Sequence, residues 1–253
     1  MSAFHIVIPA RLGSTRLPRK VLRELNGRPM VQHVWEAARG CGASSVTIAT
    51  DAEEVSRVCR EFGASVCETD PGHQSGTDRA NEVARRLGWE AQAIVVNLQG
   101  DEPLMPTALV RQAAGLLAAD AAADVATLAH PLHSREDWLN PNVVKLTLDR
   151  RGYALYFSRA PIPWAREGST REAPRLPEGL AFRHIGLYAY RVGRLAQLAE
   201  LPPAPLEQIE ALEQLRALTH GFRIRVGLTD QPPPRGVDTE DDLQAVAALL
   251  ARR

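Results

Sequence analysis

The first twenty residues place the strongest constraint on how this chain can fold. Residues 6–8, Ile-Val-Ile, form an apolar run that is typical of a buried parallel strand. The run opens into residues 9–20, a loop that combines Gly13 and Ser14 with several arginines and Lys20. Small residues let the backbone approach an anion, and cations neutralise its charge. The pattern predicts an anion-binding loop after the first strand and favours a polyphosphate; an ordinary solvated basic loop is the alternative.

Strand-like and helix-like segments then alternate through the first half of the chain. The apolar patterns predict strands at residues 4–8, 45–50, 64–68 and 93–98, with helices at 30–38, 53–62 and 79–87 between them. This alternation is typical of an α/β fold with a mostly parallel sheet and helices on both faces. Ligands of such sheets bind beyond the carboxyl ends of the strands. The loops that follow Ile8, Thr50 and Leu98 should therefore lie along one edge.

The second half of the chain has a different pattern. Two short strands at 142–148 and 153–158 flank a turn and predict a hairpin. A strand at 182–190, a helix at 206–220, a strand at 223–228 and a closing helix at 238–250 follow. Residues 165–181 are rich in Arg, Glu, Pro and Gly and are expected to form a surface loop. The length suits a single domain over residues 1–253.

Composition and charge exclude several classes of function. Lys plus Arg and Asp plus Glu each number 30, so the global field favours neither nucleic acid nor an anionic membrane as a partner. The three cysteines have neither zinc spacing nor a disulfide framework, which fits a reducing compartment. No apolar stretch approaches the roughly 20 residues of a membrane span. We expect a soluble, cytoplasmic protein without a signal peptide.

Two carboxylates stand out as candidate metal ligands. Asp101 follows a buried strand, beside Gly100, and Asp238 lies in a second acidic loop near the C-terminus. Mg²⁺ prefers oxygen ligands and is commonly held by one or two carboxylates together with substrate phosphates. Either aspartate could instead cap the helix that follows it. As a pair they predict a magnesium site.

Further polar residues form two candidate groups. Lys20 can reach phosphate oxygens, although it could also be an ordinary exposed lysine. Residues 74–79 place hydroxyls and an arginine at the start of a helix, where a base or sugar could be recognised. The alternative for these residues is a simple helix cap. Polar side chains also interrupt apolar patterns in the second half, where they could line a pocket for a polar, acidic substrate or be satisfied structural groups: His184, Tyr188, Glu207 and Gln214. The chain has no defensible Ser-His-Asp order and no GxGxxG fingerprint.

Seven motifs, in order and nearly end to end, resemble those of the sugar-acid cytidylyltransferases. Within that family, the motifs most resemble those of members that act on 3-deoxy-manno-octulosonate (Kdo). The motifs that carry this resemblance are residues 9–20, 73–79, 97–103, 153–159, 183–188, 205–210 and 236–239. The resemblance implies a Rossmann-like nucleotide-diphospho-sugar transferase fold. It also implies a magnesium-dependent homodimer that couples CTP to Kdo for lipopolysaccharide biosynthesis, giving CMP-Kdo and diphosphate.

The resemblance also implies roles for individual residues. Asp101 and Asp238 match the metal-binding aspartates and, with Lys20, the catalytic set. The nucleotide-binding positions are Arg11, Ser14, Lys20, Ser75, Gly76 and Arg79. The sugar-acid positions are Arg16, Gln99, His184, Tyr188, Glu207 and Gln214. Residues 130–190 are where the resemblance implies the dimer contact and an excursion toward the sugar pocket.

The chain departs from the family pattern at three places. Arg19 replaces a common Gly, Leu12-Gly13 varies from the commonest form, and Asp78 replaces the usual Glu. All three flank expected contacts, so they bear on loop conformation and affinity rather than on the reaction. Two other functions stay open: a cytidylyltransferase for another acid, such as the 8-amino analogue of Kdo or a sialic acid, and a non-catalytic nucleotide-binding module.

Overall fold

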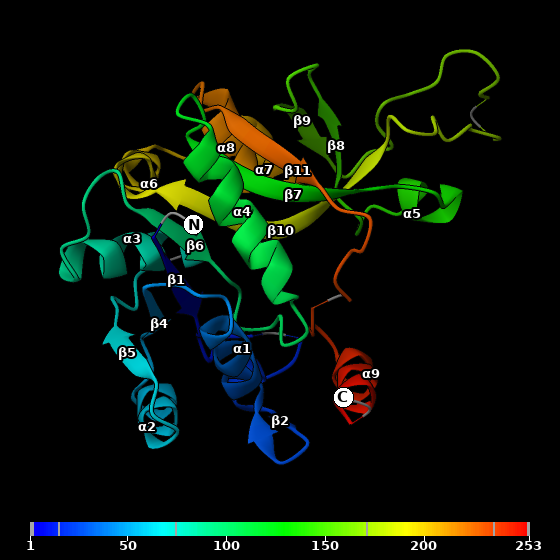
Figure 1. Ribbon diagram of the computed structural model, residues 1–253. Coiled ribbons are helices and arrows are strands. Elements are labelled where there is room, and N and C mark those ends of the chain that lie inside the picture. The colour runs from blue at the N-terminus through cyan, green and yellow to red at the C-terminus, as the bar shows by residue number, and fades with distance from the viewer. Residues whose placement is uncertain (1–2, 15, 74, 171, 235, 252–253) are drawn as a thin grey trace.

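A computed structural model describes residues 3–14, 16–73, 75–170, 172–234 and 236–251 (Figure 1). Thr15 and Gln74, which belong to motifs singled out above, lie outside these ranges, as does Arg235. The first half contains β1 (Phe4–Pro9), the 3₁₀ helix η1 (Lys20–Leu22), β2 (Glu24–Leu25), β3 (Arg28–Pro29), α1 (Met30–Arg39), β4 (Ser45–Thr50), α2 (Glu53–Glu61), β5 (Ser65–Glu68), α3 (Gly76–Arg86), β6 (Ile94–Asn97) and α4 (Thr107–Ala119). The second half contains β7 (Val125–Pro131), α5 (Arg135–Leu139), β8 (Lys145–Leu148), β9 (Ala154–Ser158), β10 (Phe182–Arg191), α6 (Val192–Glu200), α7 (Pro205–Glu210), α8 (Gln214–Thr219), β11 (Ile224–Leu228) and α9 (Glu240–Leu250).

Nine of the described strands form one sheet in the order β11-β7-β10-β6-β1-β4-β5, with β8 and β9 attached beside β10, and β2 pairs with β3 in a separate sheet. β1 pairs in parallel with β4 and β6, β4 with β5, and β11 with β7. β10 runs antiparallel to both neighbours in this row, so the other six strands share one direction. The predicted mostly parallel sheet is therefore confirmed. The predicted hairpin is also confirmed, because β8 and β9 pair antiparallel.

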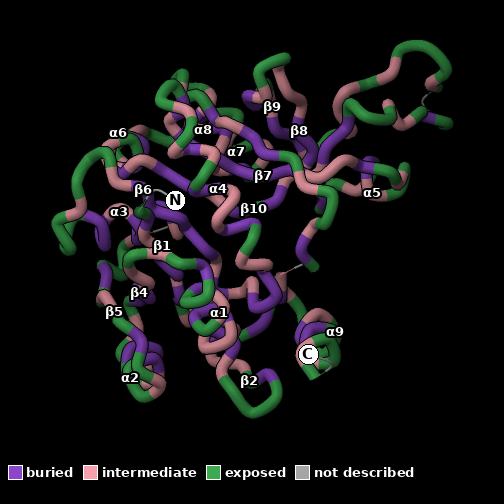
Figure 2. The backbone as a smooth tube through the Cα atoms, viewed as in Figure 1, coloured by how far each residue is buried: buried purple, intermediate pink, exposed green. Residues whose placement is uncertain are grey.

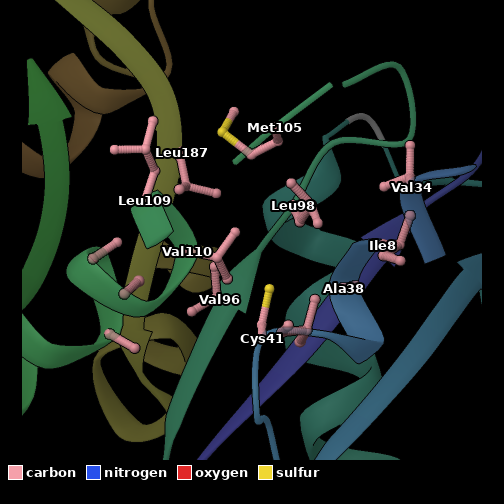
Figure 3. Close-up of a cluster of buried hydrophobic side chains, with 14 of the residues drawn as sticks. Ile8, Val34, Ala38, Cys41, Val96, Leu98, Met105, Leu109, Val110 and Leu187 are labelled. Carbon is pink, nitrogen blue, oxygen red and sulfur yellow. The ribbon is translucent and has the colours of Figure 1, made fainter. Parts of the chain in front are cut away.

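Alternate residues of β1 point to opposite faces of the sheet, as the strand period requires. Ile6 and Ile8 pack in one cluster with side chains of α1, α2 and α4, part of which Figure 3 shows. Val7 packs in another with side chains of α3, α6 and α8. The buried stretches in Figure 2 follow this sheet through the middle of the molecule. Helices thus cover both faces, as the alternating pattern predicted, whereas the single-domain boundary stays a prediction.

A third cluster attaches the C-terminal helix to the N-terminal loop. Leu17 and Leu25 pack with Val237, Leu243 and Val246, the last two on α9. Thr239 caps α9, accepting a hydrogen bond from the Asp242 amide at 3.2 Å. This packing holds residues 236–239 beside the loop that follows β1. It is the contact that joins the two ends of the chain at the carboxyl edge of the sheet.

The predicted helix over 206–220 is wrong in its continuity. The structure has two short helices, α7 and α8, separated at Ala211, whose φ of 50° lies in the left-handed region. A residue in that conformation ends a helix and redirects the chain. Among the described residues, no helix is both long and apolar enough to cross a membrane.

Candidate active site

A cleft of about 790 Å³ lies where β1 and β6 end. Its walls come from the loop after β1, the start of α3, the segment after β6 and the loop before α9. All the residues predicted to hold the nucleotide line it: Arg11, Ser14, Lys20, Ser75, Gly76 and Arg79. The fold thus brings these separate motifs together, and their roles stay predictions.

Gly100 allows the segment after β6 to run directly against the end of β1. A Cβ atom at this position would lie 2.7 Å from the carbonyl oxygen of Pro9. Because that oxygen belongs to the backbone, it could not move aside as a flexible side chain would. The missing side chain therefore lets Asp101 approach the basic loop.

Lys20 joins the two predicted metal ligands. Its Nζ donates to Oδ2 of Asp101 at 2.5 Å and to Oδ1 of Asp238 at 3.0 Å, and Arg16 pairs with the other oxygen of Asp238 at 3.0 Å. Burial acts to lower the pKa of Lys20, but the two carboxylates outweigh it and raise the pKa above its usual value. The two aspartates, far apart in sequence, therefore meet around one cation.

The backbone of Arg19, directly before Lys20, has a conformation that favours glycine. Its φ of 59° and ψ of 29° are left-handed, a conformation that costs a residue with a Cβ about 1–2 kcal/mol and glycine little. Its guanidinium pairs with Glu54 of α2, and both side chains are at least one-third exposed, so this pair contributes at most about 1 kcal/mol. The glycine common at this place in the family would suit the observed backbone.

We expect Arg19→Gly to raise the free energy of unfolding by up to about 1 kcal/mol, since removal of the left-handed strain outweighs loss of an exposed ion pair. Urea unfolding measures the change. Arg19→Ala is the control, because it loses the pair and keeps the strain, and it should be slightly less stable than the parent. A glycine variant no more stable than the alanine variant would contradict the explanation.

The start of α3 is built by a capping box. Ser75 Oγ accepts from the Asp78 amide at 3.1 Å, and Asp78 Oδ2 accepts from the Ser75 amide at 3.2 Å. Asp78, in place of the usual Glu, thus completes the cap. Arg79 is buried and donates to Asp51 at 2.9 Å and to Thr69 at 2.8 Å. Its guanidinium is therefore already held by the ends of neighbouring strands where it borders the cleft.

A second cavity of about 500 Å³ adjoins the first and shares Arg16, Asp101 and Asp238 with it. The rest of its wall comes from residues 142–144, 183–186, 233–234, 236, 239 and 242, with Glu102. Burial and the neighbouring Asp101 raise the pKa of Glu102 to about 8, so this carboxyl binds a proton more readily than a solvated glutamate does. Two cavities with a shared carboxylate border can hold two substrates whose reacting groups meet there.

The predicted sugar-acid residues do not form one group. Arg16 borders both cavities, Gln99 lines the first and His184 the second. Tyr188 and Gln214 border a much smaller third cavity beneath them. Glu207 lines none of the three. Its carboxylate accepts from Arg216 at 2.6 and 2.9 Å and from the Ala204 amide at 3.0 Å, which accounts for it as a link between α7 and α8.

The sequence analysis missed Glu213, which borders both the first and the third cavity. Its side chain is hydrogen-bonded with the hydroxyls of Ser75 and Thr77, and burial raises its pKa. A continuous helix over 206–220 offered no reason to turn this residue toward the cleft. The break at Ala211 turns Glu213 toward the cleft. A left-handed backbone at an alanine has no clear signal in a sequence.

The buried His184 should make the free energy of unfolding depend on pH. Burial lowers its pKa from 6.5 to about 3, and Thr127 Oγ1 lies 3.0 Å from its Nε2. Between these two values the unfolded chain binds the extra proton, so the free energy of unfolding falls as the pH falls below about 6.5. His184→Phe should flatten that slope by at most about 1.4 kcal/mol per pH unit. Urea unfolding between pH 7 and pH 5 tests this, and an unchanged slope would contradict it.

Comparison with known proteins gives consistent matches over nearly the whole chain. The cytidylyltransferase family model matches residues 5–224. The chain is 54% identical over 252 residues to a 3-deoxy-manno-octulosonate cytidylyltransferase of Alkalilimnicola ehrlichii, covering 99% of this chain and 97% of that protein. It is 51% identical over 250 residues to the protein of the same name from Pseudomonas fluorescens, covering 98% of each.

Solved structures agree with these matches. The structure is similar to that of a CMP:2-keto-3-deoxy-manno-octonic acid synthetase in complex with CTP, with a TM-score of 0.89, 40% identity and 99% coverage of each chain. A cytidylyltransferase from Leptospira borgpetersenii gives a TM-score of 0.64 at 16% identity, over 100% of this chain and 88% of that one. The second likeness concerns the fold alone.

Proposed function

The chain belongs to the cytidylyltransferase family, and we propose that it transfers the cytidylyl group of CTP to Kdo, forming CMP-Kdo and diphosphate. The arrangement of Lys20 between Asp101 and Asp238, on the border of two cavities, carries this proposal most directly. Such a border is where the two reacting groups of a transfer reaction must meet.

The first cavity is suited to the nucleotide. Arg11, Lys20 and the hydroxyl of Ser14 face it from the loop after β1, and the capped start of α3 faces it from another side. These are a cationic loop and a helix N-terminus, both of which favour the oxygens of a triphosphate. A similar solved structure is a complex with CTP, which supports a cytidine nucleotide as the ligand.

The second cavity is suited to a sugar acid. Arg16 and Arg183 provide positive charge for a carboxylate, and residues 142–144 and Gly186 complete the wall. A sugar in this position would present its anomeric hydroxyl at the border held by Asp101. Because the cavity is open and polar, specificity for Kdo would come from the fit of its walls around the sugar hydroxyls.

In the proposed reaction the anomeric hydroxyl attacks the α-phosphorus in line with the departing diphosphate. One O–P bond forms, the bond to the β-phosphate bridge breaks, and the hydroxyl proton is released. Lys20 and Arg16 balance the charge that develops on the phosphate oxygens, and the two cavities hold the reactants in register. The chain's own contribution is positioning and charge stabilisation.

The site fits Mg²⁺. Two carboxylates already converge on the cationic Nζ of Lys20, and carboxylate oxygens are ligands that Mg²⁺ prefers. Within the described residues no cluster of three or more His, Cys, Asp or Glu side chains is suited to a metal, so Asp101 and Asp238 would share the ion with substrate oxygens. Bound there, Mg²⁺ would neutralise phosphate charge and acidify the attacking hydroxyl.

We include in this proposal that the protein is a cytoplasmic homodimer. β9 and α7 are joined by Glu210, which accepts from Ser158 Oγ at 2.6 Å, and each presents an exposed apolar side chain, Leu155 and Ile209. Leu180, within the predicted excursion at 130–190, is exposed as well. Contact with a second copy would bury such a surface. Light scattering measures the assembly, and a monomer at micromolar concentration would contradict this part.

A diphosphate-release assay tests the function. With CTP and Mg²⁺ present, Kdo should give the highest kcat/KM in a panel that includes its 8-amino analogue and a sialic acid. If another acid gives the highest kcat/KM, the proposed substrate is wrong and the proposed type of reaction is retained. Calorimetric binding of CTP without diphosphate release with any acid would indicate a nucleotide-binding module instead.

A further inference from the structure

Lys145, at the start of β8, is a fully buried lysine that the proposed reaction does not use. Its Nζ donates to the carbonyl oxygens of Asn140 at 2.8 Å, Val143 at 2.6 Å and Arg159 at 2.5 Å. An ammonium has three N–H donors, so these bonds use all of them. Burying a charge is costly unless its hydrogen bonds are made, and here three carbonyls make them.

Two of the three acceptors belong to one loop, residues 140–144, between α5 and β8. Asn142, Val143 and Val144 of this loop line the second cavity. The same loop is held from its other side, because the amide of His184 donates to the carbonyl of Val144 at 2.9 Å. The loop is therefore fixed between the Lys145 ammonium and β10, with its outer surface facing the cavity.

The third acceptor connects this loop to the end of β9. Glu210 orders the same end, accepting from the Arg159 amide at 2.8 Å and from Ser158 Oγ at 2.6 Å. The Lys145 backbone pairs with Ser158 on one side and with Arg183 on the other. Lys145 thus lies in the middle of a three-stranded strip that carries Arg183 and His184 toward the second cavity.

We propose that Lys145 is a positioning residue for the sugar acid: its ammonium fixes the backbone of residues 140–144 as a wall of the second cavity. This inference rests on the proposed function, which assigns that cavity to the sugar acid. Lys145 itself does not line the cavity, so its effect reaches the substrate through the loop. A preordered wall spares the substrate the entropy cost of ordering it on binding.

Lys145→Met tests the proposal, since it keeps much of the side-chain volume and removes all three donors. The KM for Kdo should rise about tenfold or more, with the KM for CTP changed less than about twofold, because only the second cavity loses its wall. Leu146→Ala is the matched control. This neighbour in β8 is fully buried in a core cluster, so its truncation should lower stability by leaving a cavity in the core. It should leave the ratio of the two KM values unchanged.

Amide hydrogen exchange gives a readout that does not need the reaction. Exchange at residues 142–143 should be about tenfold faster in Lys145→Met than in the parent and in Leu146→Ala. Parental exchange in that loop, or a Kdo KM that stays unchanged, would overturn the inference. If the parent releases no diphosphate with Kdo, the proposed function fails, and the exchange result still decides whether Lys145 orders the loop. Should Lys145→Met not fold, Lys145→Gln, which keeps two N–H donors, is measured for the same selective rise in KM.

Discussion

Asp101→Asn is expected to lower kcat about 100- to 1,000-fold while the protein stays folded. The substitution preserves the shape of the side chain and removes the negative charge that, with Asp238, would hold Mg²⁺ against the substrate phosphates. The loss should appear in kcat at saturating Mg²⁺ and CTP, because the phosphate charge that the bound ion would compensate develops in the transition state.

Steady-state diphosphate release, with a Mg²⁺ titration for each protein, measures this effect. Chelation of divalent ions should abolish turnover of the parent, and added Mg²⁺ should restore it. Ser134→Ala is the control, since it removes the cap of α5, whose residues line neither cavity, and it should leave kcat unchanged. Near-normal turnover of Asp101→Asn at saturating Mg²⁺ would show that the metal assignment is wrong.

Lys20→Met should lower kcat/KM for CTP by about 100- to 1,000-fold, the usual effect of removing one charged donor from a transfer site. Lys20 is mostly buried and lies between two carboxylates, so its loss leaves Asp101 and Asp238 facing each other without the cation. The variant should therefore reach half-maximal activity at a lower Mg²⁺ concentration, because the two carboxylates no longer share their negative charge with a lysine.

Arg23→Met provides the matched control. Arg23 is a cation only three residues away, but it pairs with Glu240 outside the cleft, and both side chains are at least one-third exposed. Its removal should change kcat/KM by less than about twofold, because an exposed pair contributes little. Equal losses in the two variants would mean that general positive charge, rather than the position of Lys20, supports the reaction.

Local patterns predicted much of the fold. The apolar run before Pro9, the strand at 45–50 and the 149–152 turn each lie where propensity and turn chemistry placed them. The acidic and basic motifs fall on the edge of the sheet expected from parallel strands. Such features depend on neighbours within a few residues, and for that reason they can be interpreted without coordinates.

The helix predicted over 206–220 shows where this reasoning fails. Its amphipathic pattern is real, but Ala211 adopts a left-handed backbone that local propensity disfavours. The contacts of the two resulting helices outweigh that cost: Glu207 pairs with Arg216 across the break, and Glu213 reaches the hydroxyls of Ser75 and Thr77. Tertiary contacts decided the local structure here. They make Glu207 a link between the two helices, and its role in sugar binding stays a prediction.

By itself the sequence determined the kind of chemistry: a basic loop after the first strand, two acidic loops and a βα alternation that sends them to one edge. Only the tertiary structure decided that Lys20 stands between Asp101 and Asp238, and that Lys145 is buried against three carbonyls. Periodicity and turn residues act over a few positions, whereas these contacts join distant segments, whose meeting depends on the packing of the whole sheet and its helices.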